Sequence, residues 1–328
     1  MSLKVKCLIL TILLMASCTI EATTYASSSL ILTIQTDKTK YGFGDKVNIN
    51  GSLTLNGMPV TNALVGLQIT DNASSTLIYR TVNTGENPQV TPYVEVLSVL
   101  PCDDAGRPKS NFNRGSFAYF KVAVRNNSPD AKTAYLTLNC YYEPKEMPFF
   151  SMLFWSQAIP PNNTTTFNLP VIIPETAPLG GGKASANAFT GLPESGGYPY
   201  CPEQSATFTI ALASSVQQLQ QQEAILEELG TYNVAFSLPE NQIRVGNYTA
   251  YACYAGQVIA VTEFNVVLIG DVNGDKTVNL FDAVLLSKAS GSKPGDPNWD
   301  GRCDLNGDGV VNLFDGVLLS MNAGRTAL

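Results

Sequence analysis

The chain has 328 residues, only 14% of which are charged, and its formal net charge is −7. This length predicts two or three domains, and an acidic chain poor in Lys and Arg is not typical of proteins that bind nucleic acid or an anionic membrane. The absence of histidine excludes Ser-His-Asp and Cys-His nucleophiles and every zinc site with a histidine ligand.

The first segment, MSLKVKCLILTILLMASC, predicts export. Two lysines precede a short apolar run from Cys7 to Met15, and small residues follow. This is the layout of a signal peptide, here residues 1–25, and the run is too short for a lasting membrane span. We therefore expect a secreted or cell-surface protein with no transmembrane span in the mature chain. The LMASC stretch also resembles a lipoprotein cleavage box, which would make Cys18 a lipid anchor.

Residues 26–90 carry the period-two pattern of short antiparallel strands. In KVNINGSLTLNGMPV, apolar and polar residues alternate from Val47 to Leu55, and Asn56-Gly57 then gives a strong hairpin signal. ALVGLQIT continues the alternation. The pattern predicts the first part of a β-sandwich, because it stops after about four strands, too few to close one.

One line of this region carries a family resemblance. TDKTKYGFGDKVNINGSL resembles the opening of macroglobulin-type and related immunoglobulin-like extracellular domains. In those domains a Tyr and a Gly-Asp turn precede the second strand; here they are Tyr41 and Gly44-Asp45. The resemblance implies an immunoglobulin-like β-sandwich.

The next three segments suggest that one domain interrupts another. Residues 91–213 contain about seven strands and resemble a complete immunoglobulin-like sandwich. SSVQQLQQQEAILEELG predicts a connecting helix over 214–229. Residues 230–269 supply only three strands, and their order echoes the end of the preceding set. We expect them to complete the first sandwich, so that the second is an insertion; the alternative is a half-size third module in tandem.

The cysteines and sequons fit an exported protein. Of the five cysteines after the signal segment, Cys102 and Cys201 lie in proline-flanked segments and are the predicted disulfide. Cys140 is the rival partner for Cys102, although its strand pattern indicates a buried hydrophobe. Five sequons predict glycosylation, at Asn72, Asn126, Asn162, Asn163 and Asn247.

The β-rich body offers few residues for chemistry. Asp103-Asp104, and Glu143 with Glu146, are carboxylate clusters without a surrounding catalytic motif. CYYEPKEMPFFSMLFW is rich in aromatic residues. Exposed aromatic rings stack on sugar rings, but sandwich cores use the same residues, so both interpretations stay open.

Two acidic segments, DVNGDKTVNLFD and DLNGDGVVNLFD, repeat in one register near the end of the chain, and each precedes an apolar VLLS. An EF-hand-type loop offers oxygen ligands at positions 1, 3, 5, 7, 9 and 12, the seventh through its backbone carbonyl. These positions are Asp271, Asn273, Asp275, Thr277, Asn279 and Asp282 in the first loop, and Asp304, Asn306, Asp308, Val310, Asn312 and Asp315 in the second. Calcium is a hard cation that suits these oxygens, so we expect two calcium ions. We also expect the eighth residues, Val278 and Val311, to join the loops through a short β bridge.

This tandem is similar to a type I dockerin domain over residues 270–324, including the DPNWDGRCDLNGDG approach to the second loop. Dockerins keep only the loop and the exiting helix of an EF-hand and close the loop with Asp, as Asp282 and Asp315 do here. The resemblance implies calcium-dependent docking to a cohesin domain on a partner protein, often in assemblies that degrade polysaccharide.

Two adjacent residues of each repeat depart from the family pattern. The recognition pair, often polar in cellulosomal dockerins, is Leu280-Phe281 in one repeat and Leu313-Phe314 in the other. The departure implies a divergent cohesin. Since adjacent helical side chains point about 100° apart, we expect at least one of each pair to stay exposed. The expected partner-binding residues are Leu280, Phe281, Val284, Leu285, Leu313, Phe314, Val317 and Leu318.

The sequence therefore predicts a mostly β protein, with immunoglobulin-like sandwiches followed by a small α-helical calcium-binding dockerin. Its expected function is non-enzymatic attachment to a cohesin-bearing partner in an extracellular complex. The alternative is a carbohydrate-binding accessory subunit of a polysaccharide-degrading complex, with a glycan as a second partner. A glycosidase is a third possibility for which the sequence contains no signature.

Overall fold

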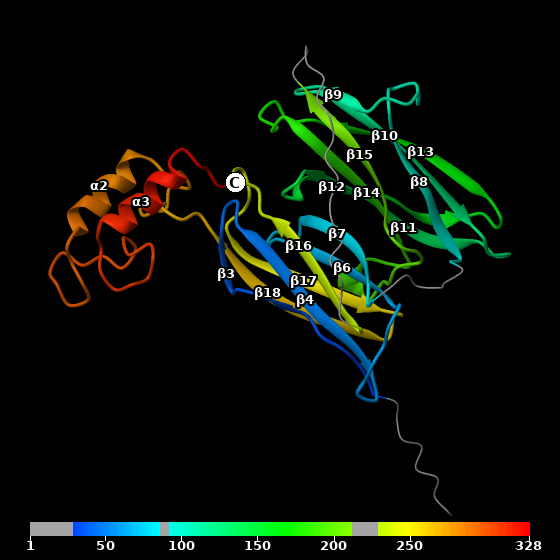
Figure 1. Cartoon of the computed structure of the whole chain (residues 1–328), viewed down its shortest axis with the longest axis horizontal. Helices are drawn as coiled ribbons and strands as arrows, with labels where there is room; N and C mark the ends of the chain where they lie inside the picture. Colours follow the sequence, from blue (N-terminus) through cyan, green and yellow to red (C-terminus); the bar gives the residue numbers. More distant parts are fainter. Residues whose placement is uncertain (1–28, 86–91, 212–228) are drawn as a thin grey trace, which may run out of the picture.

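The computed structural model describes residues 29–85, 92–211 and 229–328. The predicted signal peptide and residues 214–228 of the predicted connecting helix lie outside these residues. The predicted fold class is confirmed, since the chain is mostly β and carries a small helical region at its C-terminal end. Figure 1 shows this helical region at one end of the molecule and two groups of strands beside it.

Strands from both ends of the β body form the first sandwich. One sheet contains β1 (Leu30–Leu32), β4 (Lys46–Leu55) and β16 (Thr231–Ser237), with β2 (Gln35–Thr36) and β5 (Met58–Pro59) also paired to β4. The other contains β3 (Lys40–Gly42), β18 (Val258–Val267), β17 (Gly246–Tyr254), β6 (Leu64–Thr70) and β7 (Thr76–Asn83). Both β16–β4 and β17–β6 are antiparallel pairs between segments far apart in the sequence, which is the pairing that a split domain requires.

The alternation in β4 sets its buried face. Val47, Ile49 and Leu53 are buried, whereas Leu55 is exposed beside the turn. Asn56 and Gly57 both have positive φ, as a two-residue hairpin turn requires, and the turn joins β4 to β5. The strand pattern therefore predicted this hairpin and most of its core face.

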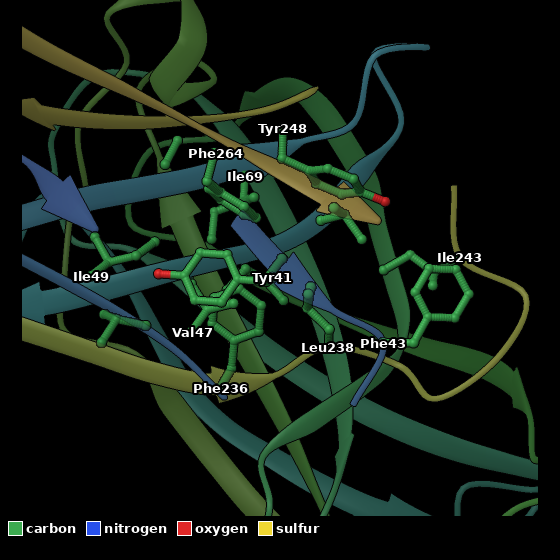
Figure 2. Packing of buried hydrophobic residues seen from close by; sticks show 14 of the residues in the cluster. Tyr41, Phe43, Val47, Ile49, Ile69, Phe236, Leu238, Ile243, Tyr248 and Phe264 are labelled. Carbon is green, nitrogen blue, oxygen red and sulfur yellow. The ribbon is translucent and has the colours of Figure 1, made fainter. Parts of the chain in front are cut away.

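Tyr41 anchors the middle of the first core. Figure 2 shows its ring among Val47, Phe236 and Phe264; the Phe264 ring meets it edge-on, with the centroids 5.3 Å apart. At its polar end, the Tyr41 hydroxyl donates to Asp37 Oδ1 at 2.7 Å. The residue that carried the immunoglobulin-like resemblance is thus a core residue whose hydroxyl is satisfied.

The second sandwich is formed entirely by the middle of the chain. One sheet has the order β13 (Thr164–Ile172), β10 (Phe117–Asn126) and β8 (Val94–Cys102). The other has the order β12 (Met147–Ile159), β11 (Lys132–Tyr142), β14 (Gly180–Phe189), β15 (Gln204–Ala211) and β9 (Asn111–Asn113). A single 3-10 turn, η1 (Pro193–Ser195), lies between β14 and β15. This sandwich has its own core cluster.

Polar contacts join the two sandwiches where β7 meets β11. Asn139 accepts a hydrogen bond from the Tyr79 backbone N–H at 3.0 Å and donates one to the Tyr79 carbonyl at 2.8 Å. The neighbouring Arg80 lies 3.1 Å from Glu203 and 3.5 Å from Glu146. All three charged side chains are largely buried, so the junction is a desolvated charge network rather than a surface contact.

The helical region contains α2 (Leu280–Ala289) and α3 (Leu313–Asn322), and most of the first acidic segment lies between β18 and α2. Leu268, Gly270 and Val272 are buried at this junction. Buried residues of the helical region belong to the same hydrophobic cluster as the first sandwich core. The helical region is therefore packed on the body at its first residues.

Candidate metal centre

Each acidic repeat folds around its first aspartate. Asp271 accepts hydrogen bonds from the backbone N–H groups of Gly274 at 2.8 Å, Asp275 at 3.1 Å and Lys276 at 3.0 Å. In the second repeat, Asp304 accepts from Gly307 at 2.9 Å, Asp308 at 3.2 Å and Gly309 at 2.9 Å. The matching set of bonds shows that both repeats form the same loop.

The fourth and sixth residues of each loop turn the chain through the left-handed region. Gly274 and Lys276 have φ of +79° and +68°, and Gly307 and Gly309 have +74° and +83°. An EF-hand-type loop needs glycine at its sixth position for this sharp turn. Lys276 adopts the same conformation with a side chain, and thereby distinguishes the first loop from the second.

In each loop, the aspartate at the fifth position is hydrogen-bonded to the seventh residue. Asp275 Oδ1 accepts from Thr277 N, and Asp308 Oδ1 accepts from Val310 N, both at 2.9 Å. The seventh-position carbonyls of Thr277 and Val310 accept from the side-chain amides of the ninth-position asparagines, at 3.4 and 3.1 Å. Hydrogen bonds therefore link the predicted ligand residues at positions five, seven and nine of each loop.

The last aspartate of each loop also starts the helix. Asp282 is fully buried and accepts from the backbone N–H groups of Val272 at 2.8 Å, Asn273 at 3.0 Å and Asn279 at 2.8 Å. The side chain of Asn279 in turn accepts from the Phe281 N–H, which completes a capping box. Asp315 and Asn312 repeat the arrangement in front of α3. The closing Asp thus fixes the helix start and the loop together.

The donor set fits calcium. Every predicted ligand is an oxygen from Asp, Asn or a backbone carbonyl, the class that calcium prefers. Within the described part of the chain, no three His, Cys, Asp or Glu side chains cluster as a metal-binding group. Hydrogen bonds, first from the Asn306 side chain and then from the Val310 backbone, hold the pKa of Asp308 below its usual value. A bound ion at each loop would neutralise carboxylates that have no basic partner within the loop.

The two loops do not pair with each other, and the expected β bridge between Val278 and Val311 is wrong. Val278 instead exchanges backbone hydrogen bonds with Gly324 and Arg325, which follow α3. Val311 exchanges them with Gly291 and Ser292, which follow α2. Each loop is therefore hydrogen-bonded to the segment that follows the other repeat's helix, and both valines are buried.

The outer faces of the helices are apolar and exposed. Leu280 and Phe281 are 75% and 70% exposed, and Leu313 and Phe314 are 79% and 68% exposed. Val284 and Val317 are also exposed, whereas Leu285 and Leu318 are half-buried. The sequence predicts at least one exposed residue in each pair, and both residues of each pair are exposed. Leu286 and Leu319, which the sequence pattern does not single out, are the buried leucines of the helices.

The predicted disulfide is wrong, because both cysteines are free thiols with different partners. Cys201 Sγ accepts from Val96 N, and Cys102 Sγ contacts Asn168 Oδ1 at 3.3 Å. Val96 and Cys102 lie six residues apart on β8, or roughly 20 Å at about 3.3 Å per residue. A disulfide needs Cα atoms within about 7 Å. The rival Cys140 is also free and buried, which agrees with its expected role as a core hydrophobe.

One of the five predicted glycosylation sites is also wrong. Asn126 is buried, and its amide nitrogen donates to the carbonyls of Asp130 and Ile159, each at 2.9 Å. Its nitrogen is therefore inaccessible to a glycan donor. The other four sequon asparagines, Asn72, Asn162, Asn163 and Asn247, are exposed, and glycosylation there stays a prediction.

The carboxylate clusters of the body have basic partners. Asp103 lies 2.7 Å from Arg107 Nε. Glu146 pairs with Arg80 and with Lys183. Burial, and then the neighbouring Glu146, raise the pKa of Glu143. One member of each cluster, Asp103 or Glu146, is therefore held in an ion pair.

The aromatic run divides between core and cleft. Tyr141 is buried, and Phe154 and Trp155 both pack on Phe167, with centroids 5.1 Å away in each case. At the other end, Tyr142 and Phe149 are stacked at 4.4 Å. These two rings line a cleft of about 850 Å³ bounded by residues 71–77, 142–151, 174–178, 239–248 and 324–328. The run therefore does not form one continuous exposed platform.

The comparison with known families decides what the helical region is. Residues 269–322 match the dockerin type I domain. Type I dockerins are non-catalytic modules that bind calcium and pair with cohesin-bearing partners in larger complexes. The dockerin match covers the two loops, both helices and the segment between them.

The remaining comparisons are distant. No curated protein matches the chain. Among solved structures, the Pseudomonas fluorescens alkylpurine DNA glycosylase AlkC is 9% identical with a TM-score of 0.27, covering 37% of this chain and 31% of its own. A CARDB domain from Pyrococcus furiosus is 9% identical (TM-score 0.26, 38% of this chain and 99% of its own). A Niemann-Pick type C2 protein from Japanese carpenter ant is 10% identical (TM-score 0.27, 38% and 96%). The chain thus spans less than a third of the first of these structures, and the scores are too low to bear on function.

Among the helices of the described residues, none is both long enough and apolar enough to cross a bilayer.

Proposed function

We propose that this protein is an exported, non-catalytic attachment protein. Its dockerin, loaded with calcium, docks to a cohesin-like domain on another protein and holds the two β-sandwiches within an extracellular or cell-surface complex. The observation that carries the proposal is the combination, in each repeat, of a folded acidic loop and an exposed Leu-Phe pair on the helix that it starts.

The exposed pairs support docking through an apolar anchor. Large apolar side chains this exposed are costly on a free surface and typical of partner-binding sites. The loop cap fixes the first turn of each helix, so calcium would hold Phe281 or Phe314 in a defined orientation. Because the repeats are nearly identical, either helix can present the anchor after a half-turn of the domain.

Capture of partners from the native culture fluid tests the proposal. The full chain is immobilised, and bound proteins are recovered in calcium and then released with a chelator. We expect a cohesin-like protein that elutes with the chelator. Recovery of the same proteins with and without calcium would contradict calcium-dependent docking.

The variants Phe281→Ala, Phe314→Ala and the double mutant test the anchor. We expect each single variant to bind nearly as well as the wild type and the double mutant to lose binding, as two equivalent modes require. Calcium loading, measured by calorimetry, serves as the control. Unchanged binding by a calcium-loaded double mutant would rule out these residues as the anchor.

A second candidate function, glycan binding by the body, is supported by the cleft that contains the Tyr142–Phe149 stack. Aromatic rings in a cleft of this size suit a sugar ring. Pull-down with insoluble polysaccharides, comparing the wild type with Phe149→Ala, tests this function. Equal retention of both proteins would contradict a role for the cleft.

A further inference from the structure

Residues 324–328 run beside the first calcium loop and form two isolated β bridges, Thr326 with Thr277 and Ala327 with Ile243. Val278 N donates to the Arg325 carbonyl at 3.0 Å, and Gly324 N donates to the Val278 carbonyl at 2.9 Å. Ala327 N then donates to the carbonyl of Lys276 at 2.9 Å. These bonds lie on either side of Thr277, whose carbonyl is the predicted seventh-position ligand.

We call residues 324–328 the strap. The other edge of the strap contacts the first sandwich. Gln242 N donates to the Thr326 carbonyl at 2.9 Å, and Leu328 N donates to the Ile243 carbonyl at 3.2 Å. Arg325 donates to the carbonyl of Phe43 at 2.6 Å. Figure 1 shows the chain returning from α3 to the body at this point. The strap therefore connects a calcium loop to the sandwich through hydrogen bonds on both of its edges.

The second loop has no equivalent connection to the sandwich among the described hydrogen bonds. Its partner segment bonds Val311 through Gly291 and Ser292 and then turns back within the dockerin, where Lys293 N bonds Asp296. Two repeats that are almost identical in sequence thus differ in their surroundings. Only the first is placed to transmit a change in loop structure to the body.

We propose that the strap couples calcium binding in the first loop to the docking of the dockerin on the first sandwich. Calcium orders residues 276–278, the residues with which the strap pairs, and the paired strap bonds to residues 242 and 243. The same coupling works in reverse, because a docked strap favours the loop conformation that binds calcium. The proposal rests on calcium binding by the loops, as proposed above.

The structural consequence is a switch between a fixed and a loosely held dockerin. With calcium in the first loop, the dockerin has one orientation relative to the first sandwich. It is held there by the strap, by the Arg325 contact and by the buried residues before Asp271. Without calcium, the loop loses its order and the strap loses one of its two partners. The second loop binds its ion without affecting this contact.

Calorimetry on the full mature chain tests the coupling. The probe is calcium alone, and each loop is measured separately, the first in an Asp304→Ala background and the second in an Asp271→Ala background. Removal of residues 326–328 should weaken calcium binding in the first loop by about tenfold, within the usual range of coupling between sites. Binding in the second loop should change by less than about twofold.

Point variants guard against misfolding of the shortened chain. Arg325→Ala removes the contact with the Phe43 carbonyl and should also weaken calcium binding in the first loop. Arg302→Ala is the matched control, since Arg302 is an exposed arginine of the same module that bonds Asp300. Unchanged first-loop affinity in both strap variants would overturn the proposal. Absence of calcium binding in the wild type would instead overturn the proposed calcium-dependent function.

The orientation is read from spin labels at Lys46→Cys and Lys288→Cys, two exposed positions on the sandwich and on α2. We expect one narrow distance distribution in calcium and a broad one after chelation. The variant without residues 326–328 should give a broad distance distribution both in calcium and after chelation. A narrow distribution after chelation, or in the calcium-loaded deletion variant, would overturn the proposal.

Discussion

Lys276 is the residue that separates the two calcium loops. It adopts φ +68° where the second loop has Gly309, and a side chain in this conformation costs about 1 kcal/mol or more. We therefore predict that two calcium ions bind, with the first loop weaker, and that Lys276→Gly raises its affinity about fivefold, the equivalent of about 1 kcal/mol.

Two variants isolate the cause. Gly309→Lys should weaken calcium binding in the second loop through backbone strain and the added charge, since Gly309 has φ +83° and a Cβ added there meets no atom within 4 Å. Lys276→Met keeps the backbone strain but removes both the charge and the hydrogen bond from Lys276 Nζ to the Leu328 carbonyl, so an affinity no higher than that of the wild type would identify the backbone as the cause. Calorimetric isotherms that give equal affinities for the two wild-type loops would contradict this account.

Asp37 gives the body an acid-sensitive contact. Burial alone would raise its pKa, but hydrogen bonds from the Tyr41 hydroxyl and from Asn48 outweigh burial and lower the pKa from 3.8 to about 2. A carboxylate whose pKa is lower when folded stabilises the fold above its unfolded pKa. That contribution is lost as the pH falls from about 4 through about 2.

The variant Asp37→Asn should therefore destabilise the chain at pH 7, by a margin that shrinks as the pH falls through this window. Urea unfolding followed by far-UV circular dichroism at several pH values provides the measurement, because Trp155 and Trp299 both lie outside the first sandwich. Asp104→Asn, in an acidic pair of the other sandwich, serves as the comparison. A constant difference from wild type between pH 7 and pH 2 would show that the carboxylate charge is not the cause.

At the scale of the elements, the contact between β7 and the second sandwich includes the buried ion pairs of Arg80. Its side chain lies between the largely buried Glu146 and Glu203, so Arg80→Ala would leave two carboxylates buried without this partner. Breaking such a network typically costs about 3–5 kcal/mol. We predict a loss of this size in the free energy of unfolding, with the two sandwiches unfolding in separate transitions.

Arg107→Ala provides the matched control for Arg80. Arg107 is largely exposed and pairs with Asp103 within one loop, and exposed pairs are worth about 0–1 kcal/mol. Chemical denaturation curves for both variants give the comparison. Similar losses in the two variants would contradict the importance of the buried network.

Local patterns predicted the elements better than their partners. The alternation in β4 and the Asn56-Gly57 turn identified a hairpin, because both signals depend on neighbouring residues. The loop spacing identified the capped helices for the same reason. Pairing of Val278 with Arg325 depends on how the two helices cross, which no short stretch encodes. The free Cys102 and Cys201 illustrate the same limit, since their separation follows from the position of β8 in the sandwich.

At the scale of the whole molecule, the split in the first sandwich makes a prediction about fragments. Residues 25–85 alone lack β16, β17 and β18, which pair with β4, β6 and β3. This fragment should be insoluble or unfolded, whereas residues 92–213 contain a complete sandwich with its own core and should fold independently. A well-dispersed NMR spectrum from the first fragment would favour tandem modules.

The first calcium loop follows β18 directly, so no flexible linker separates the sandwiches from the dockerin. A flexible linker of n residues lets a tethered domain sweep a radius of about 5–6 Å × √n, and it raises the local concentration of whatever the domain meets. Leu268, Gly270 and Val272 are instead buried between the two parts. After docking, the sandwiches would therefore not move freely relative to the dockerin. The orientation of the partner protein would set the orientation of the sandwiches.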